Sequence, residues 1–543
     1  MTQKQKSIVG GVSILGVAGI ICKVVGVLYR IPMTKIIKPS GMGVYAKVFP
    51  TYSLLLAVSS AGLPVAISRM MAHYNMKQDP ANARRIFRVA LRALLILGAV
   101  TTLLMIVLSG PLAESHNDPN TRLGFIAIAP SLFFVCAMSA YRGFLQGQRN
   151  MVPTAVSQLI EQVGRVAVAL PLAALGIRQG NVPNIALGVA GALLGSTIAE
   201  GAALLYMFFQ HRRHAKALDL IPQDPAAVPL SSRKIIQLLL IVAVPITLGA
   251  CIVPLATFID SHMICPLLVS AGFGEETSTI LYGAFEGPVI TMINVPTAIA
   301  MAMGTNLVPD IAAGLARNDR AYVAKETGIG LKMAAVVGFP CSVGMSILAK
   351  PVLYMCFRSG YADKIQYLDT AAALLEVSAM TIVLFTMVQA TSGILQGAGK
   401  QHIPMITLFI GVAMKIAMNY TLIRIPAINI HGAPWASLLC YAVSMVPNLW
   451  FVCKYTGYRF SFADIILLPL ACTLVMGGAV YMLWTFVFGD PGRLSGLVLV
   501  SGILLCVVVG VLVYGFLVLK TGTVQVENLP SKVQRLVRRF VRQ

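Results

Sequence analysis

Long apolar segments recur along the whole sequence, and they constrain the fold more than any other feature. A segment of about 18 or more such residues, at 1.5 Å per residue, crosses a hydrocarbon layer of about 30 Å as a helix. The 543 residues are 57% hydrophobic and 11% charged, and the mean hydropathy is +0.80. These values lie outside the usual range of water-soluble domains. We therefore expect an all-α, polytopic integral membrane protein.

Glycine, proline and charged residues divide the apolar sequence into about fourteen predicted transmembrane helices. Six of them precede a basic, polar stretch at 211–234, and the others follow it. The predicted helices lie near 8–30, 44–72, 86–109, 122–146, 152–177, 184–210, 235–268, 279–306, 327–350, 366–396, 403–425, 431–454, 463–488 and 494–520.

The net charge of +22 does not indicate a nucleic-acid binder, because the basic residues lie mostly in short loops between the predicted spans. About 25 of the 42 Lys and Arg residues lie on the side that holds both chain termini, and about 9 on the other side. Basic loops stay in the cytoplasm, so both termini are expected there. The basic tail at 528–543 has the pattern of an amphipathic helix lying on the membrane surface.

A weak internal repeat divides the chain. The segment GFLQGQRNMVP at 143–153 resembles GILQGAGKQHIP at 393–404, and Tyr45 with Pro50 matches Tyr282 with Pro288. Six spans per unit is an even number, so two such units keep the same orientation in the membrane. We expect two parallel six-helix lobes with a central cleft, and then a helix pair. The predicted regions are a lobe at 1–210, a linker at 211–234, a lobe at 235–454, helices 13 and 14 at 455–520, and a basic tail at 521–543.

Charged residues inside the apolar segments are the candidate functional residues, because a charge at the bilayer centre costs about 2.5–3.5 kcal/mol. Lys23 and Arg30 are seven residues apart, close to two helical turns, and give the first helix a cationic face. Arg69 follows Pro64, which should kink the second helix. Snorkelling of Arg30 and anchoring of Arg69 at the interface are the simpler alternatives.

Two carboxylates of the second predicted lobe complement these cations. Asp260 lies well inside the seventh predicted helix, and Glu286 lies in YGAFEGP of the eighth. Such groups can take a proton or a cation, or form a structural ion pair. Glu161 and Arg165, four residues apart, are expected to pair within one helix. Lys47 is expected to be an interfacial anchor.

Several chemistries have no sequence signature. The chain has no GxxxxGK[ST] loop, HExxH or GxSxG motif, and no metal-spaced Cys and His set. The ten cysteines lack CxxC pairs and are expected to be apolar packing residues. We therefore predict no catalytic residue, no metal site and no cofactor, apart from a coupling cation or the membrane potential.

The stretch GIICKVVGVLYRIPMTKIIKPSGMGVYAKVFPTYSLLLAVSSAGLPVAISRMMA at 19–72 resembles the polysaccharide-export branch of the multidrug/oligosaccharidyl-lipid/polysaccharide (MOP) transporter superfamily. The resemblance extends to RGFLQGQRNMVPTAVSQLIEQ at 142–162 and NLVPDIA at 306–312, and is strongest to the stage V sporulation protein B type with MurJ-like lipid II flippases. It implies alternating access, a cationic cavity lined by Lys23, Arg30 and Arg69, and an undecaprenyl-diphosphate-linked sugar as substrate. Lys23 departs from the arginine-rich family pattern, and Glu286 matches no residue with a known role in the family.

The predicted function is therefore a monomeric lipid II flippase of the bacterial plasma membrane, with partners among the cell-wall synthesis proteins. A flippase for a teichoic-acid or capsular precursor is one alternative. A cation-coupled multidrug antiporter is a second, although its cationic substrates favour acidic cavity residues. A membrane scaffold that transports nothing is a third.

Overall fold

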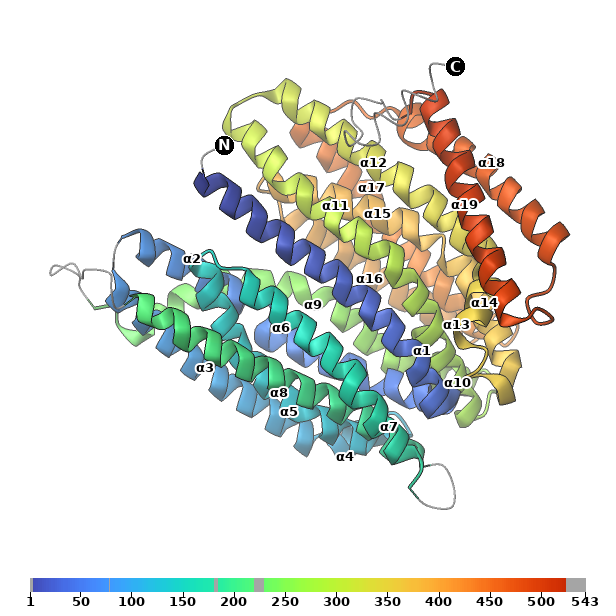
Figure 1. Ribbon diagram of the computed structural model, residues 1–543, viewed down its shortest axis with the longest axis horizontal. Coiled ribbons are helices and arrows are strands. Elements are labelled where there is room, and N and C mark those ends of the chain that lie inside the picture. The colour runs from blue at the N-terminus through green and yellow to red at the C-terminus, as the bar shows by residue number, and fades with distance from the viewer. Residues whose placement is uncertain (1–2, 78, 180–183, 219–228, 524–543) are drawn as a thin grey trace. The chain divides into compact units, whose positions relative to one another are not determined.

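The computed structural model describes the chain except for residues 1–2, 78, 180–183, 219–228 and 524–543 (Figure 1). Every regular element in the described part is helical, so the predicted all-α class is confirmed. The predicted amphipathic tail lies outside the described residues. The elements are α1 (Gln3–Ser60), α2 (Leu63–Met76), α3 (Pro80–Val107), α4 (Ser109–Ser115), α5 (Thr121–Gly147), α6 (Val152–Gly164), η1 (Arg165–Ala169), α7 (Leu170–Ile177), α8 (Ile185–Leu218), α9 (Ser232–Ser270), α10 (Glu275–Ala284), η2 (Phe285–Val289), α11 (Ile290–Ala316), α12 (Arg320–Ile347), α13 (Ala349–Phe357), η3 (Ala362–Lys364), α14 (Ile365–Ser378), α15 (Thr381–Gly397), α16 (His402–Leu422), η4 (Asn429–His431), α17 (Gly432–Thr456), η5 (Ala463–Leu467), α18 (Leu468–Leu483), η6 (Trp484–Phe488) and α19 (Gly496–Lys520).

Twelve helices of the described part are long and apolar enough to cross a membrane, and a bent pair at 362–397 brings the number to 13. The expected count of about fourteen is not confirmed. The difference lies in the first two predicted spans, which are counted together as one helical stretch, Ile21–Met76, although this stretch contains the break at Lys38. Large apolar side chains point outward on these helices, with Leu497 85% and Phe486 84% exposed. In lipid this exposure carries no hydrophobic penalty.

Backbone breaks in α1 and α2 occur beside prolines. Lys38 has φ 63° and ψ 172°, so the helical path breaks there although both flanking segments are helical. A non-glycine residue rarely adopts a positive φ, and Pro39 prevents a regular helix at this point. The second break separates Ser60 from Leu63, directly before Pro64. The helix is therefore interrupted directly before Pro64, where the sequence predicts a kink.

The chain forms two compact units, each with its own apolar cores. Unit 1 comprises 1–291, 359–364 and 419–430, and unit 2 comprises 292–358, 365–418 and 431–543. In unit 1, α5 packs against both α3 and α8, and α9 packs along α1 and α2. In unit 2, α15 packs against α12 and α17, while α18 and α19 form a neighbouring pair (Figure 1). All five candidate site residues lie in unit 1.

The sequence repeat corresponds to one helix contact that is made twice. In α5, a Cβ on Gly143 would lie 2.9 Å from the carbonyl oxygen of Pro64 in α2. In α15, a Cβ on Gly393 would lie 2.0 Å from the carbonyl oxygen of Gly304 in α11. Both glycines begin the repeated G-x-LQG segment, and both let two helix backbones touch.

We expect Gly393→Ala to lower the free energy of unfolding by about 1–3 kcal/mol, because its methyl group would overlap the α11 backbone. Gly344→Ala is the matched control, since nothing lies within 4 Å of a Cβ at that helical position. Alanine favours a helix more than glycine does, so the control should be neutral or more stable. Denaturant unfolding in detergent measures both variants, and equal stabilities would contradict the close contact.

Candidate functional site

The two cations of the first predicted helix lie on α1, where they are half-buried. Arg30 reaches the segment that joins α10 to α11, and its Nη1 donates to the carbonyl oxygen of Glu286 at 2.6 Å and to Thr291 Oγ1 at 3.3 Å. This acceptor lies in the π-helical segment η2, which contains Pro288 and has no regular α-helical hydrogen-bond ladder. Arg30 therefore fixes α1 against a distorted turn of the eighth predicted span. Lys23 is two turns away on α1.

The acidic residues predicted from the sequence lie near one another. Asp260 in α9 is only 1% exposed and accepts a hydrogen bond of 2.9 Å from Asn419 Nδ2. Tyr282 in α10 is fully buried and interacts electrostatically with both Asp260 and Glu286. The Asn419 amide oxygen and the Tyr282 hydroxyl are buried and accept no hydrogen bond in the described part. Asp260 is therefore a buried carboxylate in a polar environment that includes Asn419 and Tyr282.

Arg69 occupies a different part of unit 1. It lines a pocket of about 460 Å³ between α2 and α9, together with His73, Leu238 and Val242. The walls of this pocket are mostly apolar, and Arg69 itself is exposed. The structure therefore brings Arg30, Asp260 and Glu286 into one region and assigns Arg69 to a separate pocket.

A buried polar cluster in unit 1 surrounds Glu200 of α8, which is 2% exposed. Arg165 Nη2 lies 3.0 Å from Glu200 Oε1, and the Tyr52 hydroxyl donates to the same oxygen at 3.2 Å. The Ser131 hydroxyl lies within hydrogen-bond distance of both the Glu200 carboxylate and the Tyr52 hydroxyl, and its single proton can be donated to Glu200. The sequence showed Glu200 as an isolated acid within a span, but it held no sign of these partners.

The predicted pair of Glu161 with Arg165 is wrong. Glu161 pairs instead with Arg142 of α5, which also donates to Ser157 at 2.8 Å. Arg165 begins the π-helical segment η1, so the two side chains do not share the regular α-helical spacing. Each finds its partner on a neighbouring helix.

The prediction that Lys47 is an interfacial anchor is wrong, because this residue is only 2% exposed. Its Nζ lies 2.9 Å from Asp118 Oδ2 and 2.8 Å from Thr279 Oγ1. The ammonium group therefore joins α1, the segment before α5, and α10. A buried lysine requires such partners, since an unpaired charge there is strongly disfavoured.

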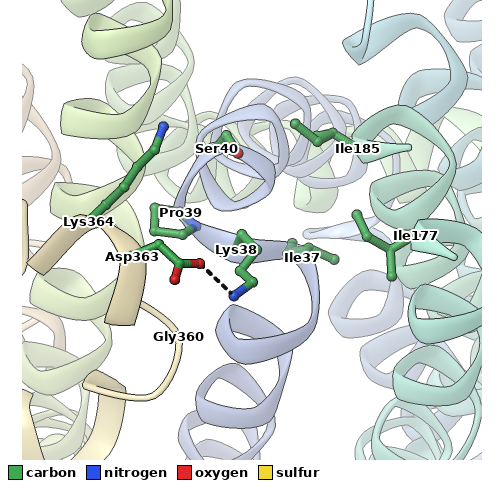
Figure 2. A pocket seen from close by; sticks show the side chains of 9 residues that line it. All are labelled: Ile37, Lys38, Pro39, Ser40, Ile177, Ile185, Gly360, Asp363 and Lys364. Atoms are coloured by element: carbon green, nitrogen blue, oxygen red, sulfur yellow. Dashed lines mark hydrogen bonds and ion pairs between the residues drawn. The ribbon is translucent and has the colours of Figure 1, made fainter. Parts of the chain in front are cut away.

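A pocket of about 260 Å³ lies beside the break in α1 at Lys38 (Figure 2). Figure 2 shows Lys38 turned toward Asp363, with 3.2 Å between the ammonium and carboxylate groups. Lys364 pairs with Glu276 at 2.7 Å. The segment 359–364 is thus fixed to α1 and α10 by two exposed ion pairs, each of which is worth little energy alone.

In the described part of the chain, no group of three or more His, Cys, Asp and Glu side chains has metal-binding geometry. The charged groups instead form pairs of opposite sign that bridge separate helices. Long apolar helices, outward apolar side chains and buried charge pairs together define a multi-pass α-helical membrane protein.

Comparison with known proteins identifies the family. The model of the polysaccharide biosynthesis protein family matches residues 8–314, more than half of the chain, and the MatE model matches residues 287–421. The chain therefore belongs to the polysaccharide biosynthesis protein family, within the MOP superfamily, and it is a membrane transporter rather than an enzyme.

Three relatives illustrate the similarity. Lipid II flippase MurJ of Bacillus subtilis (strain 168) is 25% identical over 507 residues, which cover 90% of this chain and 91% of that protein. Stage V sporulation protein B of the same organism is 26% identical over 467 residues, covering 84% and 87%. A solved structure of lipid II flippase MurJ in an inward closed conformation gives a TM-score of 0.69 at 13% identity, covering 93% and 97%. The last similarity concerns the fold alone.

Proposed function

We propose that this transporter is a flippase that moves an undecaprenyl-diphosphate-linked cell-wall precursor, lipid II, from the inner to the outer leaflet. The observation that carries the proposal is the pair of cations on α1, Lys23 and Arg30, inside an apolar span. Guanidinium and ammonium groups are suited to a diphosphate. Both described bonds of Arg30 use Nη1, so Nε and Nη2 retain donors for a phosphate oxygen. The resemblance to MurJ and to stage V sporulation protein B agrees with this substrate class.

Arg69 has a distinct role in this proposal. Its pocket combines a guanidinium with apolar walls from α2 and α9, a chemistry that suits a phosphate attached to a lipid chain. The proposed substrate-binding set is thus Lys23, Arg30 and Arg69, with the two α1 cations in one site and Arg69 in another.

Asp260 and Glu286 form the proposed coupling site. The carboxylate of Asp260 is buried and is supported by Asn419 and Tyr282, so it suits a monovalent cation or a proton. We propose that this transporter lies in the bacterial plasma membrane as a monomer. Its basic loops support the placement of both termini in the cytoplasm.

The direct test measures lipid II orientation in cells that depend on this protein as their only flippase. Depletion should leave lipid II in the inner leaflet, and Lys23→Ala or Arg30→Ala should fail to restore its appearance outside. Lys35→Ala is the matched control, since it removes an exposed cation from the same helix. Normal outer-leaflet lipid II after depletion would overturn the proposal.

A multidrug antiporter is the second candidate, favoured by the MatE match at 287–421. Its cationic substrates are repelled by Lys23 and Arg30, which makes it the weaker candidate. Drug efflux from a null strain distinguishes it from a flippase. Accumulation of a teichoic-acid or capsular precursor on depletion would instead indicate a flippase with a different glycan substrate.

A further inference from the structure

Two histidines meet beside the buried Lys47 pair, where α1, the segment 116–121, α9 and α10 come together. The rings of His116 and His262 have centroids 4.0 Å apart. His116 is 5% exposed, and its Nε2 has no hydrogen-bond partner in the described part of the chain. His262 Nδ1 lies 3.0 Å from the carbonyl oxygen of Phe258. This cluster of His116, His262, Lys47 and Asp118, which we term the histidine latch, has no role in the proposed substrate site.

The helices that carry the histidine latch touch at glycines. A Cβ on Gly43 of α1 would lie 2.2 Å from the carbonyl oxygen of Thr279, and a Cβ on Gly283 of α10 would lie 2.5 Å from the backbone nitrogen of Gly43. Thr279 is also the residue whose hydroxyl contacts Lys47. The backbones of α1 and α10 are therefore in direct contact beside the latch, with no space for a larger side chain between them.

Electrostatics oppose a proton on His116 while this end is closed. Burial, with the nearby His262 and Lys47, lowers the pKa of His116 to about 3, while the carbonyl group of Ser261 acts in the opposite direction. Two titratable groups act on His116: Lys47 of α1 and His262 of α9. Phe125 of α5 also contacts the His116 ring but carries no charge. Cys265 of α9 and Asp118 also lie beside Lys47. Asp118 is occupied by Lys47 and therefore compensates a second positive charge poorly.

The sign of the pH effect follows from linkage. A histidine with a lowered pKa in the closed form is neutral there, and it regains its ordinary pKa of about 6.5 when it becomes exposed. Acid therefore favours the exposed form between about pH 6.5 and 3. One titrating histidine changes the ratio of the two forms by up to about tenfold per pH unit.

The helix that carries His262 can bend. The first part of α9, including Ile235 and Ala243, packs in a core with Met70 and Phe87 of unit 1. Pro245 and Pro254 separate this part from His262, and prolines inside a helix remove hydrogen bonds and permit kinks. The latch end of α9 can therefore move while the opposite end remains packed.

We propose that the histidine latch is a proton-binding site that holds one end of the transport path closed when neutral and opens it when protonated. The proposal rests on the proposed function, in whose topology this end faces the cell exterior. Protonation of His116 or His262 places a second cation beside Lys47, and the resulting repulsion separates α9 and α10 from α1 and the segment 116–121.

The test uses the purified full-length chain in nanodiscs without substrate, so its result does not depend on whether lipid II is transported. Spin labels on unnatural amino acids at Ser115 and Glu275, both exposed, report the distance across the latch by double electron–electron resonance. We expect a single short distance at pH 8. Below about pH 6.5, a second form with a longer distance should appear, and the ratio of the longer to the shorter form should rise by up to about tenfold per pH unit.

Two variants make the outcome decisive. His116→Asn with His262→Gln should abolish the pH dependence, whereas His402→Asn, a change at an exposed histidine, should retain it. Gly43→Val should show the longer distance already at pH 8, because its side chain cannot fit against Thr279. Two outcomes would overturn the proposal. In the first, the distance in the unmodified chain stays short down to pH 4.5 although Gly43→Val lengthens it. In the second, the pH response survives the removal of both histidines.

Discussion

Replacing Lys47 with methionine is expected to lower the free energy of unfolding by about 3–5 kcal/mol, the range observed when one partner of a buried ion pair is removed. Methionine has a similar length but cannot neutralise Asp118, which is 8% exposed and lies 2.9 Å from the ammonium group. Thr279 would also lose its contact with Lys47. Denaturant unfolding in detergent measures the loss.

The control for Lys47→Met is Lys38→Met, which removes the same charge from an exposed pair with Asp363. That change should cost less than about 1 kcal/mol, because exposed ion pairs contribute little. The double variant Lys47→Met with Asp118→Asn should recover much of the lost stability, because no unpaired charge remains. Equal losses for Lys47→Met and Lys38→Met would contradict a buried Lys47.

Replacing Arg165 with methionine is expected to cost a similar amount, about 3–5 kcal/mol, because it leaves the carboxylate of Glu200 buried without a cation. Tyr52 and Ser131 still donate hydrogen bonds to Glu200 in the variant, but they cannot neutralise it. The same unfolding measurement applies, and a reduced yield of folded protein in the membrane is the expected accompanying effect.

Arg178→Met is the matched control for Arg165→Met, since it makes the same replacement at an exposed position at the end of α7. It should change stability by less than about 0.5 kcal/mol. Adding Glu200→Gln to Arg165→Met should recover stability, because glutamine still accepts hydrogen bonds from Tyr52 and Ser131. If the double variant is as unstable as Arg165→Met, the loss comes from packing and not from the buried charge.

The sequence predicted the helical segments well, because a span requires a long apolar run that can be read directly. The prediction near 122–146, for example, corresponds to α5, and the prediction near 494–520 corresponds to α19. The glycines of the repeat were also visible, although only the structure shows that Gly143 and Gly393 make equivalent contacts. The count of spans was harder to predict, since α1 runs from the first predicted span into the second and is broken between them only at Lys38.

The partners of the intramembrane charges could not be predicted from the sequence. Lys47 pairs with a residue 71 positions away and contacts another 232 positions away. Arg30 contacts a carbonyl group 256 positions away, and a backbone acceptor leaves no mark in the sequence. The predicted pair of Glu161 and Arg165 followed a helical spacing rule that the π-helical segment η1 interrupts. Local rules fail for charges whose partners lie on other helices.

The break at Lys38 also has a consequence for synthesis of the protein. The first two predicted spans are joined by only about a dozen residues, and most of these are themselves helical. Figure 1 shows the chain changing direction in α1 without a long loop. A connection this short leaves little room for one span to insert and settle before the next emerges from the ribosome. The two spans should therefore enter the membrane together as a helical hairpin, which carries Lys35 and Lys38 across the bilayer at its tip.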